Sequence, residues 1–214
     1  IRKITPDGTV TTLPGTAALP GTIESVRHLA LDGAGNLYAA GFSRVSKITP
    51  SGIITTFKEF NGVQDLKFPI TGVAVDGAGA VYVARVAIGV PVPSVTALGW
   101  VLRFNAQGTE VRYPGITGVP GSATVEYPAG ITADSAGNVF VACAGTVNGK
   151  VCSSIKRISP TGDLTIVAGT NANGSADGIG TSASFRRPQG VKLGPQGELL
   201  VADTDNHTIR VIAP

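Results

Sequence analysis

Short apolar segments alternate with glycine-containing turns along the whole chain. A typical stretch is V-K-L-G-P-Q-G-E-L-L-V-A (residues 191–202), in which two apolar runs flank a turn at Pro195 to Gly197. Apolar runs this short, bounded by glycine and proline, are typical of strands rather than helices. The pattern therefore predicts an all-β chain of many short antiparallel strands.

The apolar segments belong to two alternating phrases. One phrase occurs at residues 28–40, 72–84, 130–142 and 190–202, so its successive copies start 44, 58 and 60 residues apart. The other occurs at residues 1–13, 45–57, 101–113 and 155–167, and in truncated form at 209–214. Each phrase contains two predicted strands. Repeats of about this length with four short strands each are typical of propeller blades.

The last repeat carries a family resemblance. Its string L-L-V-A-D-T-D-N-H-T-I-R (residues 199–210) resembles the signature of the NHL repeat, which forms one blade of a β-propeller. The resemblance implies a single domain over residues 1–214, with about four NHL-like four-stranded blades, three of them complete and the end blades split. That family usually closes with more blades, so we expect a window on a larger propeller, or an open arc whose end strands pair with another chain.

The two ends of the predicted blades differ in sequence. The turns within each phrase are short and contain glycine, so they lie together at one end of the antiparallel blades. The long segments fall at the other end: residues 58–67, 87–99, 114–126, 146–151 and 169–186. Variable loops on a rigid scaffold usually carry binding, which makes this loop face the candidate functional surface.

Composition narrows the class of protein. Charged residues make up 14% of the 214 residues and the net charge is +3, which does not predict a nucleic-acid partner. Five cations are read as one solvated strand position recurring once per blade: Lys3, Lys47, Arg103, Arg157 and Arg210. No apolar run is long enough for membrane insertion. The absence of methionine and of a leader indicates a mature product or an excised piece.

The two cysteines flank one loop. Cys143 and Cys152 lie on strands predicted to be neighbours, so a disulfide between them is accessible and favoured, with two buried thiols as the alternative. A two-residue turn at Asn148-Gly149 would set Cys143 opposite Ser154 rather than opposite Cys152. A disulfide would favour an extracellular, cell-surface or periplasmic location. Two cysteines with no histidine nearby do not predict a metal site.

Five residues are candidates for binding. Trp100, Phe60 and the pair Arg186 and Arg187 are predicted at the loop face, where aromatic and arginine side chains commonly anchor partners. His28 stands where the other three copies have glycine, on the strand that the resemblance places along the central channel. It either contacts a ligand or fills space that the glycines leave empty.

The favoured function is a non-enzymatic binding or scaffold propeller with a protein, peptide or glycan on its loop face, and without a cofactor. One alternative is a structural, filament-forming surface protein that self-associates through its end strands. Another is an enzyme resembling propeller lactonases or lyases with a metal in the channel. Such sites need several acids and amides. The residues at the predicted channel positions do not include such a set, since they are Ala30, Ala74, Thr132 and Lys192.

Overall fold

The computed structural model describes residues 1–13, 25–61, 68–86, 99–113, 122–147 and 150–214. The first complete antiparallel sheet contains β3 (His28–Leu31), β4 (Leu37–Ala40), β5 (Arg44–Ile48) and β6 (Ile54–Glu59). The second contains β7 (Ile70–Val75), β8 (Val81–Val86), β9 (Gly99–Phe104) and β10 (Ser122–Thr124). The third contains β11 (Pro128–Ala133), β12 (Val139–Val147), β13 (Lys150–Ile158) and β14 (Leu164–Thr170).

Two smaller sheets lie at the ends of the chain. A hairpin of β1 (Arg2–Ile4) and β2 (Val10–Thr12) stands at the N-terminus, and a three-stranded sheet of β15 (Pro188–Leu193), β16 (Leu199–Asp203) and β17 (Thr208–Ile212) at the C-terminus. Short 3-10 turns occupy Gly180–Ser182 (η2) and Thr204–Asn206 (η3). The prediction of an all-β chain is confirmed.

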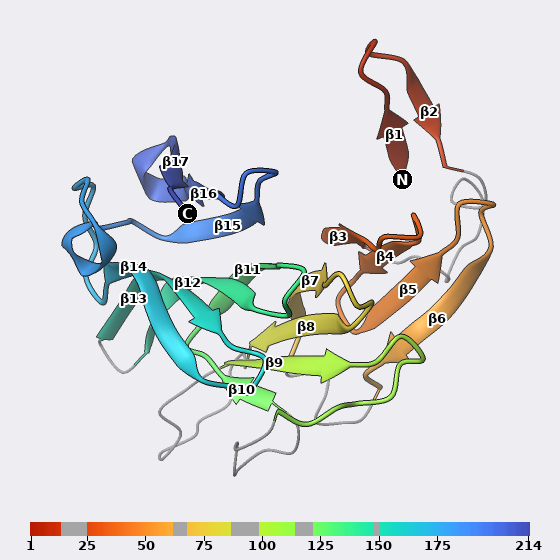
Figure 1. The fold of residues 1–214 in the computed structure, drawn as a ribbon, viewed down its shortest axis with the longest axis horizontal. Coiled ribbons are helices and arrows are strands. Elements are labelled where there is room, and N and C mark those ends of the chain that lie inside the picture. Colours follow the sequence, from red (N-terminus) through yellow and green to blue (C-terminus); the bar gives the residue numbers. More distant parts are fainter. Residues whose placement is uncertain (14–24, 62–67, 87–98, 114–121, 148–149) are drawn as a thin grey trace.

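The sheets stand side by side as a fan (Figure 1), with β3, β7, β11 and β15 along its inner side. Neighbouring inner strands approach closely. A methyl group built on Gly130 would lie 2.6 Å from the carbonyl oxygen of Gln189 in the next inner strand, so only glycine permits this spacing. The N-terminal hairpin and the β15–β17 sheet lie at opposite ends of the fan.

The core lies between the faces of successive sheets. Three clusters of buried apolar side chains fill these spaces, one for each contact between neighbouring complete sheets and one against β15–β17. Strand β8 is buried at all six positions because neighbours cover both of its faces. A strand in the middle of the fan can therefore be apolar on both faces and need not alternate apolar with polar residues.

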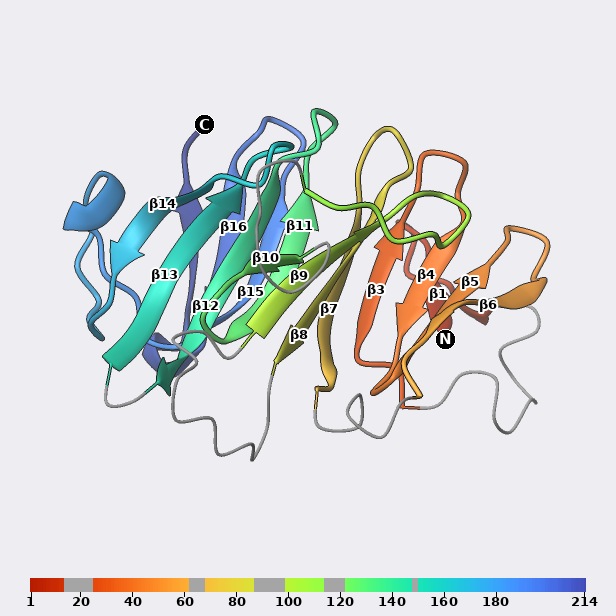
Figure 2. The ribbon, with the colours of Figure 1, turned by 90° about the horizontal axis from the view of Figure 1, so that it is seen from below.

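The short turns share one edge of the fan (Figure 2), as predicted. In each of the three complete sheets an aspartate closes the turn that follows the innermost strand. Its carboxylate accepts hydrogen bonds from two backbone N–H groups of that turn. Asp32, for example, accepts from Ala34 at 3.0 Å and from Asn36 at 2.8 Å. Asp76 and Asp134 do the same. These carboxylates at the turn end are therefore engaged in local structure.

One predicted strand is wrong. The phrase at residues 101–113 was expected to supply the fourth strand of its sheet, but only a bridge between Phe104 and Glu110 forms there. The fourth strand is β10, which pairs with Trp100–Leu102 at the start of β9. Tyr113 instead turns into the core and is 2% exposed. In the described part of the chain, no helix is long and apolar enough to cross a membrane.

Candidate functional site

An aromatic cluster with an arginine at its centre lies where strands β8 and β9 reach the loop face. The Arg85 guanidinium lies 4.1 Å from the centre of the Phe60 ring and 5.9 Å from that of Phe68. Arg85 Nε donates a hydrogen bond to the Phe68 carbonyl at 2.7 Å. The Phe68 ring in turn meets Trp100 edge-on, with 4.9 Å between centres. These contacts fix the Trp100 ring, which stays half-buried at the surface.

Phe60 was predicted to contact a partner, and the structure contradicts this. Its side chain is 6% exposed and belongs to the core cluster between the first two complete sheets, where it also meets Phe104 edge-on. The link after β6 turns the ring inward, because Arg85 offers a cation for its face. The buried Phe60 ring contacts the Arg85 guanidinium and so helps to hold the aromatic cluster in place. A partner at the loop face would reach Trp100 instead.

Arg85 itself was missed by the sequence analysis. It is 6% exposed, although it carries a charge within an otherwise apolar strand. A charged residue at the end of an apolar run was the available signal, since such residues are rarely buried without partners. The Phe68 carbonyl and the rings of Phe60 and Phe68 contact the guanidinium and take the place of water around it.

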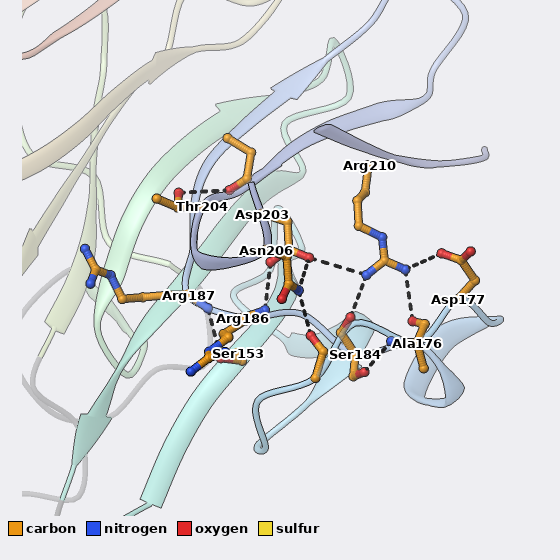
Figure 3. Close-up of polar contacts among 12 residues, drawn as sticks. Ser153, Ala176, Asp177, Ser184, Arg186, Arg187, Asp203, Thr204, Asn206 and Arg210 are labelled. Carbon is orange, nitrogen blue, oxygen red and sulfur yellow. Dashed lines mark hydrogen bonds and ion pairs between the residues drawn. The ribbon is translucent and has the colours of Figure 1, made fainter. Parts of the chain in front are cut away.

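Arg186 and Arg187 lie in the link before β15, and the β11–β14 sheet separates them from Trp100. Both side chains are exposed. The Arg186 backbone N–H donates to Asp203 at 2.7 Å (Figure 3). Arg187 has a positive φ of 54° and pairs with Asp205 at 3.7 Å. The two arginines and Trp100 therefore do not form one patch.

A buried polar network holds this link to the last sheet (Figure 3). The Asp203 carboxylate is fully buried and accepts from Asn206 Nδ2 at 2.8 Å and from Arg210 Nη1 at 3.4 Å. Arg210 also donates to the carbonyls of Ser184 at 2.6 Å and Ala176 at 2.9 Å. The network thus fixes the loop from Ala176 to Arg186 against strands β16 and β17.

The interpretation of Arg210 as one of the recurring solvated cations is wrong. Strand pairing sets Leu37 opposite Ile48 and Leu199 opposite Ile212, which makes Val211 the counterpart of Lys47. Arg210 comes one position before Val211 in β17, so its side chain points to the opposite face of the sheet. Its side chain is 15% exposed and packs over the Phe185 ring.

His28 lines a small cavity of about 210 Å³ between the inner strands. The four residues predicted to face the channel also line this cavity: Ala30, Ala74, Thr132 and Lys192. No residue of the lining carries a carboxylate. Burial, assisted by the charge of Arg27, lowers the pKa of His28, which favours neutral imidazole. The glycines at the equivalent places do not all leave empty space, since Gly130 is pressed against Gln189.

Cys143 and Cys152 are both free, buried thiols, so the structure does not contain the predicted disulfide. The register is the one expected from a two-residue turn, with Cys143 opposite Ser154 and Cys152 opposite Gly145. The turn residues Asn148 and Gly149 themselves lie outside the described residues. The thiols are therefore diagonal neighbours on one face of the sheet, which holds their β-carbons farther apart than direct opposition would. One argument for an extracytoplasmic location is lost with the disulfide.

A lysine and a glutamate accompany the thiols, and the sequence analysis missed both. Lys156 is 6% exposed and pairs with Glu126 from the link before β11. Burial alone would raise the pKa of Glu126, but the hydrogen bond and charge of Lys156 outweigh it and leave that pKa lowered. Across the described ranges, no three His, Cys, Asp or Glu side chains gather as a metal site requires.

The comparisons with known proteins agree with this fold. YCF48 bound to D1 peptide superimposes on 94% of the chain with a TM-score of 0.55 and 12% identity, and 56% of that chain is covered. A gluconolactonase from Xanthomonas campestris superimposes on 94% with a TM-score of 0.55 and 13% identity, and 60% of it is covered. The fold is that of a β-propeller.

Part of the chain is also similar in sequence to known proteins. Residues 185–212 match the NHL repeat. NHL repeat-containing protein 2 from Bos taurus and from Homo sapiens is 37% identical over 100 residues, which is 45% of this chain and 13% of each relative. The last repeat of the chain is thus matched as an NHL repeat, in agreement with the predicted resemblance. The chain spans about an eighth of the length of those relatives.

Proposed function

We propose that this protein is a non-enzymatic binding propeller that takes a peptide on its loop face, with Trp100 as the anchor. The observation that carries the proposal is the rigid stack of Phe60, Arg85 and Phe68 beneath a half-exposed Trp100. An aromatic side chain that is already ordered loses little entropy when it binds, which is why such residues dominate interfaces. The four-stranded sheets are the blades of this propeller.

Two features support the loop face over the turn end. The turn-end carboxylates of Asp32, Asp76 and Asp134 are engaged within their own turns. The loop face, by contrast, exposes the rings and cations of Phe42, Arg27, Arg186 and Arg187. The structure of YCF48 with a peptide shows that a propeller of this outline can hold one, although at 12% identity it carries the fold alone.

The enzyme alternative has less support. The cavity between the inner strands has no carboxylate in its lining, and its hydroxyl at Thr132 accepts the Leu193 N–H at 3.3 Å. The ionisable side chains in its lining are those of His28 and Lys192, so the several acids and amides that hold a metal in such a channel are not among them. The similarity to the gluconolactonase therefore supports a shared fold and does not support a shared reaction.

The proposal is tested by panning a random peptide library against the wild-type protein, Trp100→Ala and Ile53→Ala. Ile53 is a matched control, because it is 62% exposed but lies at the turn end. We expect a peptide motif that wild type and Ile53→Ala enrich and Trp100→Ala does not. Equal enrichment on all three proteins would overturn the role of Trp100. Hydrolysis of gluconolactone without any enriched peptide would favour the enzyme.

Self-association is a second candidate function. Among the described residues, the outer edge of β17 has no strand partner, and a groove of about 1240 Å³ runs along it. Exposed Ile209 and Val211 lie on this strand. Such an edge can accept a strand from a second copy. Light scattering tests this: a concentration-dependent ladder of masses supports it, and a constant monomer mass contradicts it.

A further inference from the structure

The two thiols and the lysine form one buried site on the β12–β13 hairpin. Cys143 lies opposite Ser154, and Cys152 and Lys156 lie two residues to either side of Ser154. Residues two apart on a strand share a face, so these four side chains point to the same side of the sheet. Cys143 is fully buried, whereas Cys152 and Lys156 retain 4% and 6% exposure.

The neighbouring sheet shows what these positions can do. Strand pairing makes Cys143 the counterpart of Asp203 and Lys156 the counterpart of Arg210, because Val141 pairs with Lys156 as Val201 pairs with Arg210. In the last sheet the two positions hold a carboxylate and a guanidinium 3.4 Å apart. In the β11–β14 sheet the cation is kept and the buried thiol of Cys143 takes the place of the carboxylate, so a buried cation lies beside sulfur here instead of beside an acid.

The groups around Cys152 are polar in an otherwise apolar core. Its sulfur lies 3.8 Å from the Ser154 hydroxyl, and the Cys143 thiol is its diagonal neighbour on the same face of the sheet. Hydrogen bonding with the Cys143 side chain lowers the pKa of Cys152 against the opposing effect of burial, and the charge of Lys156 lowers it further. Burial raises the pKa of Cys143. Of the described residues, the titratable groups that act on Cys152 are Cys143, Lys156 and Glu126.

We propose that Cys143, Cys152 and Lys156 form a redox-active dithiol site that reduces hydrogen peroxide or a small hydroperoxide. The Cys152 thiolate attacks one peroxide oxygen, the O–O bond breaks, and the leaving hydroxide takes a proton from solvent to become water. Cys152 is then a sulfenic acid. The Cys143 sulfur attacks it, the S–O bond breaks, and the hydroxide leaves as water with the Cys143 proton. Two thiols are oxidised to a disulfide, for which the β12–β13 hairpin shifts so that the two diagonal β-carbons meet. Hydrogen peroxide is thereby reduced to two waters, and a hydroperoxide to an alcohol and water.

The geometry assigns different roles to the two sulfurs. Cys152 is the attacking residue, because it alone of the pair keeps contact with solvent. Cys143 is the resolving residue, since it is fully buried and is the diagonal neighbour of Cys152 on the same face. Lys156 is a positioning residue that stabilises the thiolate without touching the peroxide.

The test treats the whole folded protein with hydrogen peroxide and counts free thiols, with intact mass before and after dithiothreitol. We expect both thiols of the wild type to disappear together and to return on reduction. Cys143→Ser is expected to stop at the sulfenic acid, which dimedone traps at Cys152, and Cys152→Ser is expected to leave Cys143 unreactive. Urea unfolding midpoints confirm that each variant is folded.

The lysine is tested separately by the rate of iodoacetamide alkylation as a function of pH. Lys156→Gln should slow alkylation of Cys152 about tenfold at neutral pH and move its midpoint to higher pH, because losing the cation raises the thiol pKa. Lys3→Gln, which removes an exposed cation from β1, should change nothing. Thiols that react only at the rate of protein unfolding, or an equal rate in Lys156→Gln, would overturn the proposal.

Discussion

Arg210 Nη1 lies 3.4 Å from the completely buried carboxylate of Asp203. The two residues come from adjacent strands, and the pair joins them to the long link before β15 through Arg186, Ser184 and Ala176. Arg210 supplies donors to two backbone carbonyls of this link, and the Asp203 carboxylate balances its charge.

Removing the carboxylate should therefore be costly. Asp203→Ala leaves the Arg210 guanidinium without its buried counter-charge, and we expect the free energy of unfolding to fall by about 3–5 kcal/mol, measured in urea. Asp177 also contacts Arg210 but is 98% exposed, so Asp177→Ala should have little effect. Equal losses in the two variants would contradict the central role of Asp203.

The burial of Phe60 can be tested in the same way. Phe60→Ala should lower the free energy of unfolding by about 3–5 kcal/mol, because it opens a cavity in the core between the first two complete sheets. Phe42→Ala is the control, since that ring is 38% exposed and should cost much less. A small loss for Phe60→Ala, together with lost peptide binding, would restore the original prediction that Phe60 is a contact residue.

The spacing of the inner strands makes a third prediction. Gly130→Ala places a methyl group 2.6 Å from the Gln189 carbonyl oxygen, and we expect a loss of about 1–3 kcal/mol in a urea titration. A methyl group on Gly33 meets nothing within 4 Å, so Gly33→Ala should be near neutral. A neutral result at Gly130 would mean that the inner strands separate easily.

His28 predicts a pH dependence. Its pKa in the folded protein is lowered from the ordinary 6.5 by burial and by Arg27, so the unfolded chain takes up a proton at a higher pH than the folded one. This contribution to stability is complete above pH 6.5 and is lost as the pH falls toward the folded pKa. His28→Gln should therefore lose less stability than the wild type between pH 7.5 and the onset of carboxylate protonation. Parallel unfolding midpoints for both proteins would contradict it.

The sequence predicted the fold well because its signals are local. Glycine turns, apolar runs and the string from Leu199 to Arg210 each act within one repeat, and they predict the sheets that the structure contains apart from the fourth strand of the second complete sheet, which is β10. The side-chain roles depend on neighbouring repeats and were harder to predict. Phe60 turns inward because Arg85 meets it from another sheet. Arg210 was misplaced because a shift of one residue in the alignment reverses the face of a strand.

The cysteines show the same limit. Their register was predicted correctly from the two-residue turn, yet the thiols are free and Lys156 and Glu126 stand beside them. The glutamate reaches the site from a different link, so no spacing along the chain could reveal it. Comparing equivalent positions in two sheets, Cys143 with Asp203 and Lys156 with Arg210, is the signal that the sequence did contain.

Trp100 is the only tryptophan of the chain, so its fluorescence reports directly on the proposed anchor. The central measurement is a titration of the wild-type protein with a peptide selected from the library, following tryptophan emission. The account predicts a saturable change in emission whose midpoint matches the dissociation constant from calorimetry, and binding that is lost in Trp100→Ala. Peptide binding that leaves the emission of Trp100 unchanged and survives Trp100→Ala would contradict it.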